Sequence, residues 1–237
     1  MRLQVFLSHN GVCSRRKALI LIAEGRVTID GRMQREPSTP VNGTETIAVD
    51  GNVVVVKAYH YILLNKPVGV TTTKDDPHAD KTVMDLLPLE YQHLSPVGRL
   101  DRDSAGLLLL TNDGDLAFRL THPSFHEEKK YEVIVNGEIN KDKIKQLSQG
   151  ILIKEEDGAS YRTLPCQIAD VDYNNGQTKM TMIIREGRKR QIRLMMRAIG
   201  HQVKELTRVA MGTIVIGDLP VGHWRYLDEK EVLSLKK

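Results

Sequence analysis

Two aspartates in a short polar stretch are the first residues of this sequence whose types and spacing suggest catalysis. Asp101 and Asp103 alternate with Arg99 and Arg102, and the apolar run Leu107–Leu110 follows shortly after them. Because turn residues bound that run on both sides, it predicts a buried strand rather than a helix. A rigid strand end is a suitable support for a loop that carries a catalytic carboxylate. The alternative is that both aspartates are solvated turn residues paired with the neighbouring arginines.

A second polar stretch, residues 185–197, is dense in positive charge and contains a single acid, Glu186. Its six bases are Arg185, Arg188, Lys189, Arg190, Arg193 and Arg197. The apolar residues here recur at helical spacing, so we expect a helix with a buried face of Ile192, Met195, Met196 and Ile199. The bases of the preceding loop would surround the helix N-terminus, which is a ready anion site. A solvated basic loop is the alternative, but charges this dense repel one another unless something neutralises them.

Residues 1–57 predict a small separate domain of two helices followed by short strands with Asp-Gly turns. Ser14 is a candidate N-cap of the second helix, whose apolar face we expect to consist of Ala18, Leu19, Ile22 and Ala23. The basic residues around that helix are Arg15, Arg16 and Lys17 at its start and Arg26 after its end. A helix start is already positively polarised, so bases there cost stability unless an anion binds. The pattern therefore favours contact with RNA phosphates over a merely solvated helix face.

Residues 61–237, after a candidate linker near 57–60, predict a larger α+β domain. Strands are expected at 61–65, 131–135, 151–153, 164–168, 180–184 and 213–216, and helices at 139–147 and 229–235. Because strands and helices do not alternate regularly, a doubly wound sheet is not expected. Tyr131 begins one of these strands, where the residues alone favour an ordinary core or edge aromatic.

Composition narrows the class of protein. The chain has 237 residues, a formal net charge of +4 and a pI near 9.0, which weakly favours a polyanionic partner. Cys13 and Cys166 are the only cysteines and have no Cys/His pattern around them, so neither a zinc site nor a disulfide framework is expected. Because no signal peptide or membrane-spanning run is evident, we expect a cytoplasmic protein.

Several motifs resemble one known family. The stretch GRLDRDSAGLLLLTNDG, the later EGRKRQIRLMM, a Lys-Pro-x-Gly turn at Lys66, a Leu-x-Arg-x-x-x-Gly pattern at Arg208 and a Gly-x-Trp-Arg-x-Leu near the end are similar to the RsuA/RluB/E/F group of pseudouridine synthases. The N-terminal RLQVFLSHNGVCSRRKALILIAEGRVTIDG resembles the small RNA-binding fold of ribosomal small-subunit protein four. The resemblance implies a helix-helix-strand RNA-binding domain followed by a larger, mixed but mainly antiparallel sheet of pseudouridine-synthase type.

The resemblance also implies site residues. Asp101 takes the position of the indispensable aspartate, Tyr131 that of a tyrosine against the target base, and Arg193 that of an arginine that contacts the aspartate. An ionised carboxylate can stabilise or trap positive charge on the ribose when the base is detached. The RNA-binding residues expected on the same grounds are Arg15, Arg16, Lys17, Arg26, Arg99, Arg188, Lys189 and Arg190.

The expected function is isomerisation of one rRNA uridine to pseudouridine, with no cofactor and no metal. Details of the motifs and tail favour small-subunit (16S) rRNA, with large-subunit (23S) rRNA as the alternative. The partner would be ribosomal RNA or an assembling ribosomal subunit, not a membrane. A non-catalytic RNA-binding assembly protein would show the same basic patches. A carboxylate glycosidase would need a second acid, for which Asp103 is available.

Overall fold

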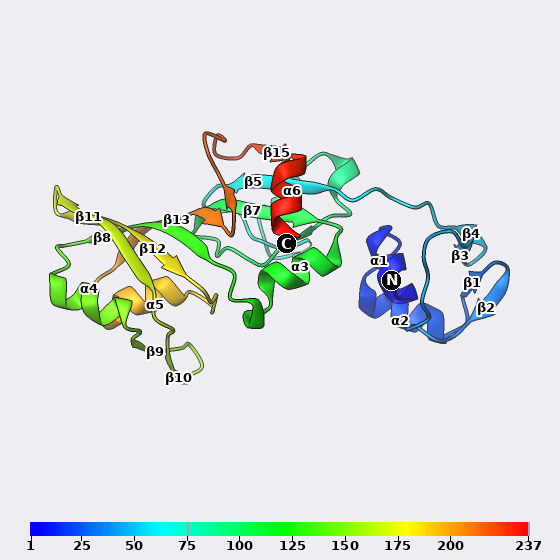
Figure 1. Ribbon diagram of the computed structural model, residues 1–237, viewed down its shortest axis with the longest axis horizontal. Helices are drawn as coiled ribbons and strands as arrows, with labels where there is room; N and C mark the ends of the chain where they lie inside the picture. Colours follow the sequence, from blue (N-terminus) through cyan, green and yellow to red (C-terminus); the bar gives the residue numbers. More distant parts are fainter. Residues whose placement is uncertain (75, 237) are drawn as a thin grey trace.

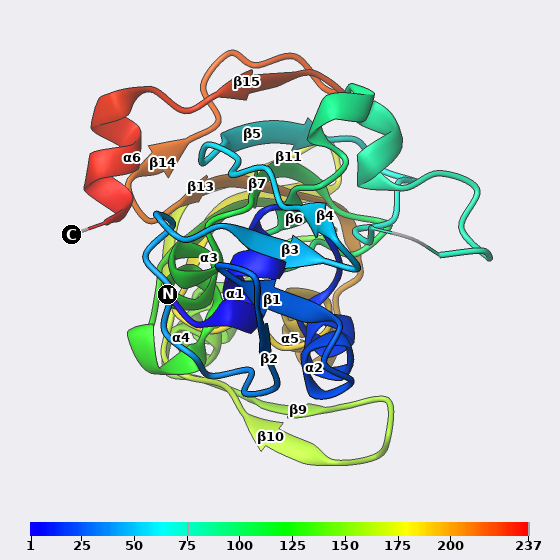
Figure 2. The same ribbon diagram turned by 90° about the vertical axis from the view of Figure 1, so that its right-hand side faces the viewer.

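The N-terminal part of the chain forms a compact unit in the computed structural model, which describes residues 1–74 and 76–236. Two helices lead into an antiparallel sheet of strand order β2-β1-β3-β4, as Figures 1 and 2 show. The elements are α1 (Leu3–His9), α2 (Arg15–Ala23), β1 (Val27–Ile29), β2 (Arg32–Gln34), β3 (Ile47–Val49) and β4 (Asn52–Val53). Asp30-Gly31 and Asp50-Gly51 both have positive φ, which fits the expected tight turns.

The predicted N-cap of α2 is confirmed, but its predicted buried face is partly wrong. The Ser14 side chain accepts a hydrogen bond from the Lys17 backbone N–H at 3.2 Å. The helix buries Ala18, Leu21 and Ile22, whereas Leu19 is 41% exposed and Ala23 is exposed as well. Leu21 lies three residues after Ala18 and therefore shares its face, while Leu19 is turned about 100° away from it.

The rest of the chain is organised on one long mixed sheet. Its order is β11-β12-β8-β13-β7-β5-β15, with β14 paired to β13 and β6 paired to β7. Among these pairs β13 and β7 run parallel and the others antiparallel. The strands are β5 (Tyr61–Lys66), β6 (Ser95–Pro96), β7 (Ala105–Thr111), β8 (Lys129–Asn136), β11 (Gln167–Asn174), β12 (Gln177–Ile184), β13 (Val203–Met211), β14 (Ile214–Val215) and β15 (Trp224–Tyr226). The expected α+β class with a mainly antiparallel sheet is thus confirmed.

The central strand β7 is buried on both faces, as its continuous apolar run predicted. Leu108 and Leu110 point into one hydrophobic core, and Leu107 and Leu109 into another. The first core also contains apolar side chains of α4 and α5, and the second those of α3 and α6. Two layers of helices therefore fix the strand that follows the Asp101 loop.

The helices largely follow the predicted pattern. They are η1 (Val83–Leu86), η2 (Leu89–Tyr91), α3 (Gly114–Thr121), η3 (Pro123–Phe125), α4 (Lys141–Ser148), α5 (Gln191–Ala198) and α6 (Glu229–Leu235). The predicted strand at 164–168 is mostly wrong, because the Leu164 and Cys166 N–H groups bond to the Glu186 side chain and the Ser148 carbonyl rather than to a neighbouring strand. No helix within the described ranges is both long and apolar enough to cross a membrane.

A separate hairpin projects from the large sheet. It consists of β9 (Leu152–Lys154) and β10 (Ser160–Arg162), and both views show it standing away from the main body below α5 (Figures 1 and 2). Its turn carries Glu155 and Glu156, which become important for the basic loop before α5.

Candidate active site

The loop that carries Asp101 is anchored from below by a buried lysine. The Ser104 N–H donates to the Asp101 carbonyl at 3.0 Å and closes the turn. Lys66, at the end of β5, is completely buried, and its Nζ donates to the carbonyls of Ser104 at 2.7 Å and Pro67 at 2.9 Å. Burial lowers the pKa of Lys66 to about 8, and the charges of Asp101 and Asp103 oppose that lowering. Lys66 therefore supplies positive charge directly beneath the loop.

A row of residues crosses the sheet beside this loop. Register places Lys66 opposite Gly106, Gly106 opposite Arg208, and Arg208 opposite Tyr131. Gly106 has φ +103°, and a Cβ there would lie 2.2 Å from the Arg208 carbonyl oxygen, so only glycine allows β13 to approach this closely. The Arg208 Nε donates to the Leu107 carbonyl at 2.8 Å. The row thus brings two buried bases and an aromatic ring to one face of the sheet.

Tyr131 lies in the first hydrophobic core and is 8% exposed. Its hydroxyl makes no hydrogen bond with any residue in the described ranges. Tyr131 therefore packs as an ordinary core aromatic. Its hydroxyl, however, has no partner among the described residues.

Arg193 contacts Asp103 directly, rather than Asp101 as the resemblance implied. Its Nη2 donates to the Asp103 carbonyl at 2.6 Å, and its Nε lies 3.2 Å from Asp103 Oδ2. Arg190 grips the same carboxylate with two hydrogen bonds, of 3.2 and 2.9 Å. The charge of Asp101 reaches Lys66, Arg190 and Arg193 only through space. Asp103 thus pairs with Arg190, which was expected to bind RNA phosphate, and with Arg193, which was expected to contact Asp101.

The two aspartates consequently have different chemistry. Burial alone would raise the pKa of Asp103, but the Arg190 hydrogen bonds and the charges of Arg193 and Arg190 hold that pKa below its usual range. A carboxyl of this kind cannot serve as the general acid of a glycosidase. Asp101 is half-buried and its side chain makes no hydrogen bond or ion pair within residues 1–74 and 76–236. It is therefore the carboxylate that remains available.

The basic loop before α5 is held by Glu186. This carboxylate accepts hydrogen bonds from Gln191 Nε2 at 2.5 Å, the Leu164 N–H at 2.8 Å and the Tyr161 hydroxyl at 2.8 Å. Gln191 also accepts from the Arg188 N–H through its side-chain oxygen at 3.1 Å. The Glu and Gln of the EGRKRQIR motif therefore shape the loop.

The bases of that loop already have partners. Arg188 binds Glu155 at 2.7 Å and lies 3.5 Å from the centre of the Tyr161 ring, and Lys189 binds Glu156 at 2.5 Å. The β9–β10 hairpin thus neutralises Arg188 and Lys189, while Asp103 pairs with Arg190 and Arg193 and Glu128 pairs with Arg185. The expected apolar face of α5 is confirmed, since Ile192, Met195, Met196 and Ile199 are all buried.

The N-terminal bases differ in their freedom. Arg16 and Lys17 are exposed, and Arg15 reaches the start of α3. Arg26 instead binds both oxygens of Asp50, at 2.8 and 2.6 Å. Arg99, on the loop that carries Asp101, is exposed, and its side chain has no hydrogen bond or ion pair to the described residues.

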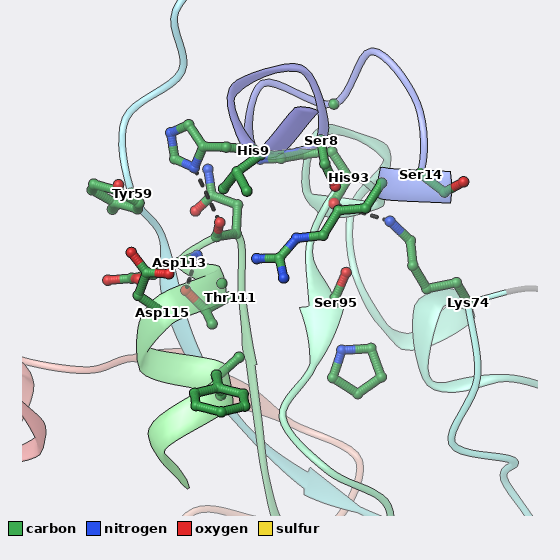
Figure 3. A pocket seen from close by; sticks show the side chains of 18 of the residues that line it. Ser8, His9, Ser14, Tyr59, Lys74, His93, Ser95, Thr111, Asp113 and Asp115 are labelled. Carbon is green, nitrogen blue, oxygen red and sulfur yellow. Dashed lines mark hydrogen bonds between the residues drawn. The ribbon is translucent and has the colours of Figure 1, made fainter. Parts of the chain in front are cut away.

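A cleft of about 880 Å³ separates the N-terminal unit from the large sheet. Figure 3 shows it with His9, Tyr59 and Asp113 on one side and Lys74 and Ser95 on the other. His9 joins the two parts, because its ring nitrogens bond the carbonyls of Asn112 and Lys57, each at 3.0 Å. The position of the first unit is therefore set by a few polar contacts around an open space.

Two residues of the site had no assigned role on sequence grounds. Lys66 and Arg208 both lie in motifs noted above, the Lys-Pro-x-Gly turn and the Leu-x-Arg-x-x-x-Gly pattern. Their membership of those motifs is the only sequence signal for either residue, because neither strand sequence shows by itself that the base is buried. Among the described residues, no cluster of three or more His, Cys, Asp or Glu side chains is arranged to hold a metal ion.

Comparisons with known proteins agree with this architecture. Residues 60–198 match the RNA pseudouridylate synthase family and residues 1–47 match the S4 domain. A protein of Aquifex aeolicus (strain VF5) named "Uncharacterized RNA pseudouridine synthase" is 39% identical over 100% of this chain and 94% of its own length. The "Ribosomal large subunit pseudouridine synthase B" of Bacillus subtilis (strain 168) is 37% identical over 99% of this chain and 95% of its own.

A solved structure supports the same conclusion. A crystal structure described as a pseudouridylate synthase superimposes with a TM-score of 0.70 and 28% identity, covering 99% of both chains. The sequence matches and the shared fold show that this chain belongs to the RNA pseudouridylate synthase family, is a pseudouridine-forming isomerase, and carries an S4 domain at its N-terminal end.

Proposed function

We propose that this enzyme isomerises a uridine of large-subunit (23S) rRNA, with Asp101 as its catalytic carboxylate. The observation that carries the assignment of Asp101 is the contrast between the two loop aspartates. Asp103 is bound by Arg190 and Arg193, whereas Asp101 has no partner within the described residues and faces the same charges. A carboxylate that must meet a developing positive charge needs to be ionised and unengaged before substrate binds.

The reaction breaks the bond between uracil N1 and ribose C1′, rotates the base, and forms a bond from C5 to C1′. The proton on C5 is lost and N1 gains one, so the change is an isomerisation with no redox partner. We assign charge stabilisation or covalent trapping to Asp101. Tyr131 is assigned contact with the base, its free hydroxyl being suited to the C5 proton. Arg193 is assigned the electrostatic support of Asp101, through space or after leaving Asp103.

The choice of rRNA follows from the relatives. The Bacillus subtilis protein is named for the large ribosomal subunit, and so is a 38% identical protein of Yersinia pestis that aligns with 100% of this chain and over 75% of its own length. These names favour the large-subunit alternative over the small-subunit preference that the motif details and the tail suggested.

We propose that RNA is held along both domains, taken as residues 1–57 and 61–237. Arg15, Arg16, Lys17 and Arg99 are free to contact phosphates in the described structure. Arg26, Arg188, Lys189 and Arg190 are assigned the same role, although each is bound to a carboxylate in the free protein. Their contribution therefore requires an exchange of partners. The substrate is free rRNA or rRNA in an assembling subunit.

The test is tritium release from C5-labelled large-subunit and small-subunit rRNA. Asp101→Asn should lower release about a hundredfold to a thousandfold, the effect of removing a key electrostatic group, while RNA affinity should stay within about twofold of the wild type because the substitution adds no clash and removes no phosphate contact. Asp218→Asn, an exposed aspartate far along the chain, is the matched control and should behave as wild type. Normal release by Asp101→Asn would refute the catalytic assignment, and release from small-subunit rRNA alone would refute the substrate.

A further inference from the structure

A second hollow lies beside the catalytic loop. This groove, of about 720 Å³, is formed by the turn after β5, the loop before β7, α5 and the start of β13. Its lining residues that matter here are Asp103, Arg190, Arg193, Arg197, Lys204 and Glu205. Because Asp103 stands two residues from Asp101, the groove adjoins the position proposed for the reacting nucleotide. It is distinct from the cleft between the two domains.

The groove has an excess of positive charge, with four Arg and Lys side chains against two carboxylates. Arg190 and Arg193 are balanced by Asp103. The side chains of Arg197 and Lys204 make no ion pair or hydrogen bond with any part of the chain that the structure describes. Both are exposed, so their charges face solvent within the groove.

A β-bulge directs the Lys204 side chain into the groove. Val203 pairs with Val135 and Glu205 pairs with the next residue, Ile134, so Lys204 is the extra residue of a β-bulge. Two successive side chains, Lys204 and Glu205, are exposed as a result, where a regular strand would alternate. Bulges are common beside active sites because they redirect a side chain without ending the strand.

Arg197 is aligned with the site by the helix. It follows Arg193 by four residues, so the Cβ atoms of the two residues lie about 5–6 Å apart on one face of α5. Arg193 touches the catalytic loop, and Arg197 therefore lies one turn further along the groove. A base in the last helical turn also favours the helix dipole, but that explains neither Lys204 nor the convergence of both cations on one hollow.

We propose that this groove binds the sugar-phosphate backbone of the nucleotides next to the target uridine, with Arg197 and Lys204 as phosphate contacts. The proposal rests on the proposed function only in identifying the ligand as RNA. Neither residue touches the reacting base, so both are positioning residues that act on RNA affinity. Phosphate contacts release counterions, and each contact therefore contributes to the salt dependence of binding.

The experiment measures binding of unmodified large-subunit rRNA transcript between 50 and 200 mM salt, with tritium release in parallel. Arg197→Gln and Lys204→Gln should each reduce the slope of log affinity against log salt by about 0.7–0.9, and the double variant by about twice as much. KM should rise by a larger factor than kcat falls. Arg197→Lys, which keeps the charge, should recover the wild-type slope.

Lys230→Gln is the matched control, because Lys230 is an exposed lysine on α6 without a partner in the described residues. Its slope should equal that of the wild type. If the double variant also keeps the wild-type slope, the groove proposal is wrong. The binding measurement does not depend on turnover, so absence of tritium release by the wild type would refute the proposed function while leaving the groove result decisive.

Discussion

Replacing Lys66 with methionine tests whether its charge or its shape supports the loop that carries Asp101. Methionine has nearly the same length as lysine but neither charge nor donor. The Lys66 ammonium is completely buried, and its two hydrogen bonds go to the carbonyls of Ser104 and Pro67 rather than to a carboxylate. The variant therefore removes a charge that the fold pays to bury and a contact that fixes the Asp101 loop.

The magnitude follows from the pKa of Lys66. A shift from 10.5 in the unfolded chain to about 8 in the folded protein means that burying the charge costs about 3 kcal/mol at neutral pH. Because the folded pKa is the lower one, this cost is complete below pH 8 and disappears as the pH rises from about 8 to 10.5. Methionine avoids the cost but leaves two carbonyls without a donor, at about 1–3 kcal/mol each. The net change in unfolding free energy at pH 7 should therefore lie between about 1 kcal/mol of stabilisation and about 3 kcal/mol of destabilisation.

Two assays check this reasoning. In denaturant unfolding, the stability of the wild type relative to Lys66→Met should increase by up to about 3 kcal/mol between pH 8 and 10.5. In tritium release, kcat of the variant should fall about tenfold to a hundredfold, since a displacement of about 1 Å in a catalytic group has effects of that order. Wild-type activity should decline as the pH passes about 8, and the variant should lack this decline.

The exposed lysine Lys230, changed to methionine, controls for loss of a positive charge elsewhere. An Lys66→Met enzyme with wild-type kcat and an unchanged pH profile would show that the buried ammonium neither positions the loop nor supports its carboxylate.

Three further substitutions test other contacts. Asp103→Asn should lower unfolding free energy by about 1–3 kcal/mol, because it leaves the largely buried Arg193 without its counter-charge. Since the pKa of Asp103 is lowered in the folded protein, denaturant titrations should show the full wild-type advantage above the ordinary carboxyl pKa and its loss as the pH falls through the lowered pKa. Gly106→Ala should cost about 3 kcal/mol or more, since its Cβ would collide with the Arg208 carbonyl at a positive φ, and equal denaturation midpoints would contradict this. Ser14→Ala should cost about 1 kcal/mol, visible as faster hydrogen exchange in α2, and protection equal to the wild type would argue against the cap.

Periodicity and turn chemistry were sufficient to predict much of the fold. The run Leu107–Leu110 predicted a strand buried on both faces, and the spacing from Ile192 to Ile199 predicted the buried face of α5, because both signals are local. The predicted α2 face was partly wrong, because an unbroken run of apolar residues from Ala18 to Ala23 allows more than one buried face, and packing against α1 selected the one with Leu21.

The site was less predictable, because its decisive contacts join distant segments. Asp103 and Arg193 are separated by 90 positions, and nothing in their spacing shows which aspartate the arginine reaches. Lys66 illustrates the same limit: a lysine at a strand end is usually solvated, and its complete burial depends on the Asp101–Ser104 turn folding over it.

The β9–β10 hairpin has a consequence for discrimination among polyanions. Its two glutamates, Glu155 and Glu156, form ion pairs with Arg188 and Lys189 in the free enzyme. These carboxylates therefore compete with RNA phosphates for the same two bases. An RNA phosphate that binds Arg188 or Lys189 must displace the glutamate paired with it. The net gain in free energy is therefore smaller than it would be at an unpaired cation. Non-specific nucleic acid that contacts only these bases gains little binding free energy from this exchange of partners. An RNA strand that also binds other sites on the enzyme gains enough free energy to displace the glutamates. The hairpin therefore lowers the affinity for non-specific nucleic acid more than the affinity for the substrate.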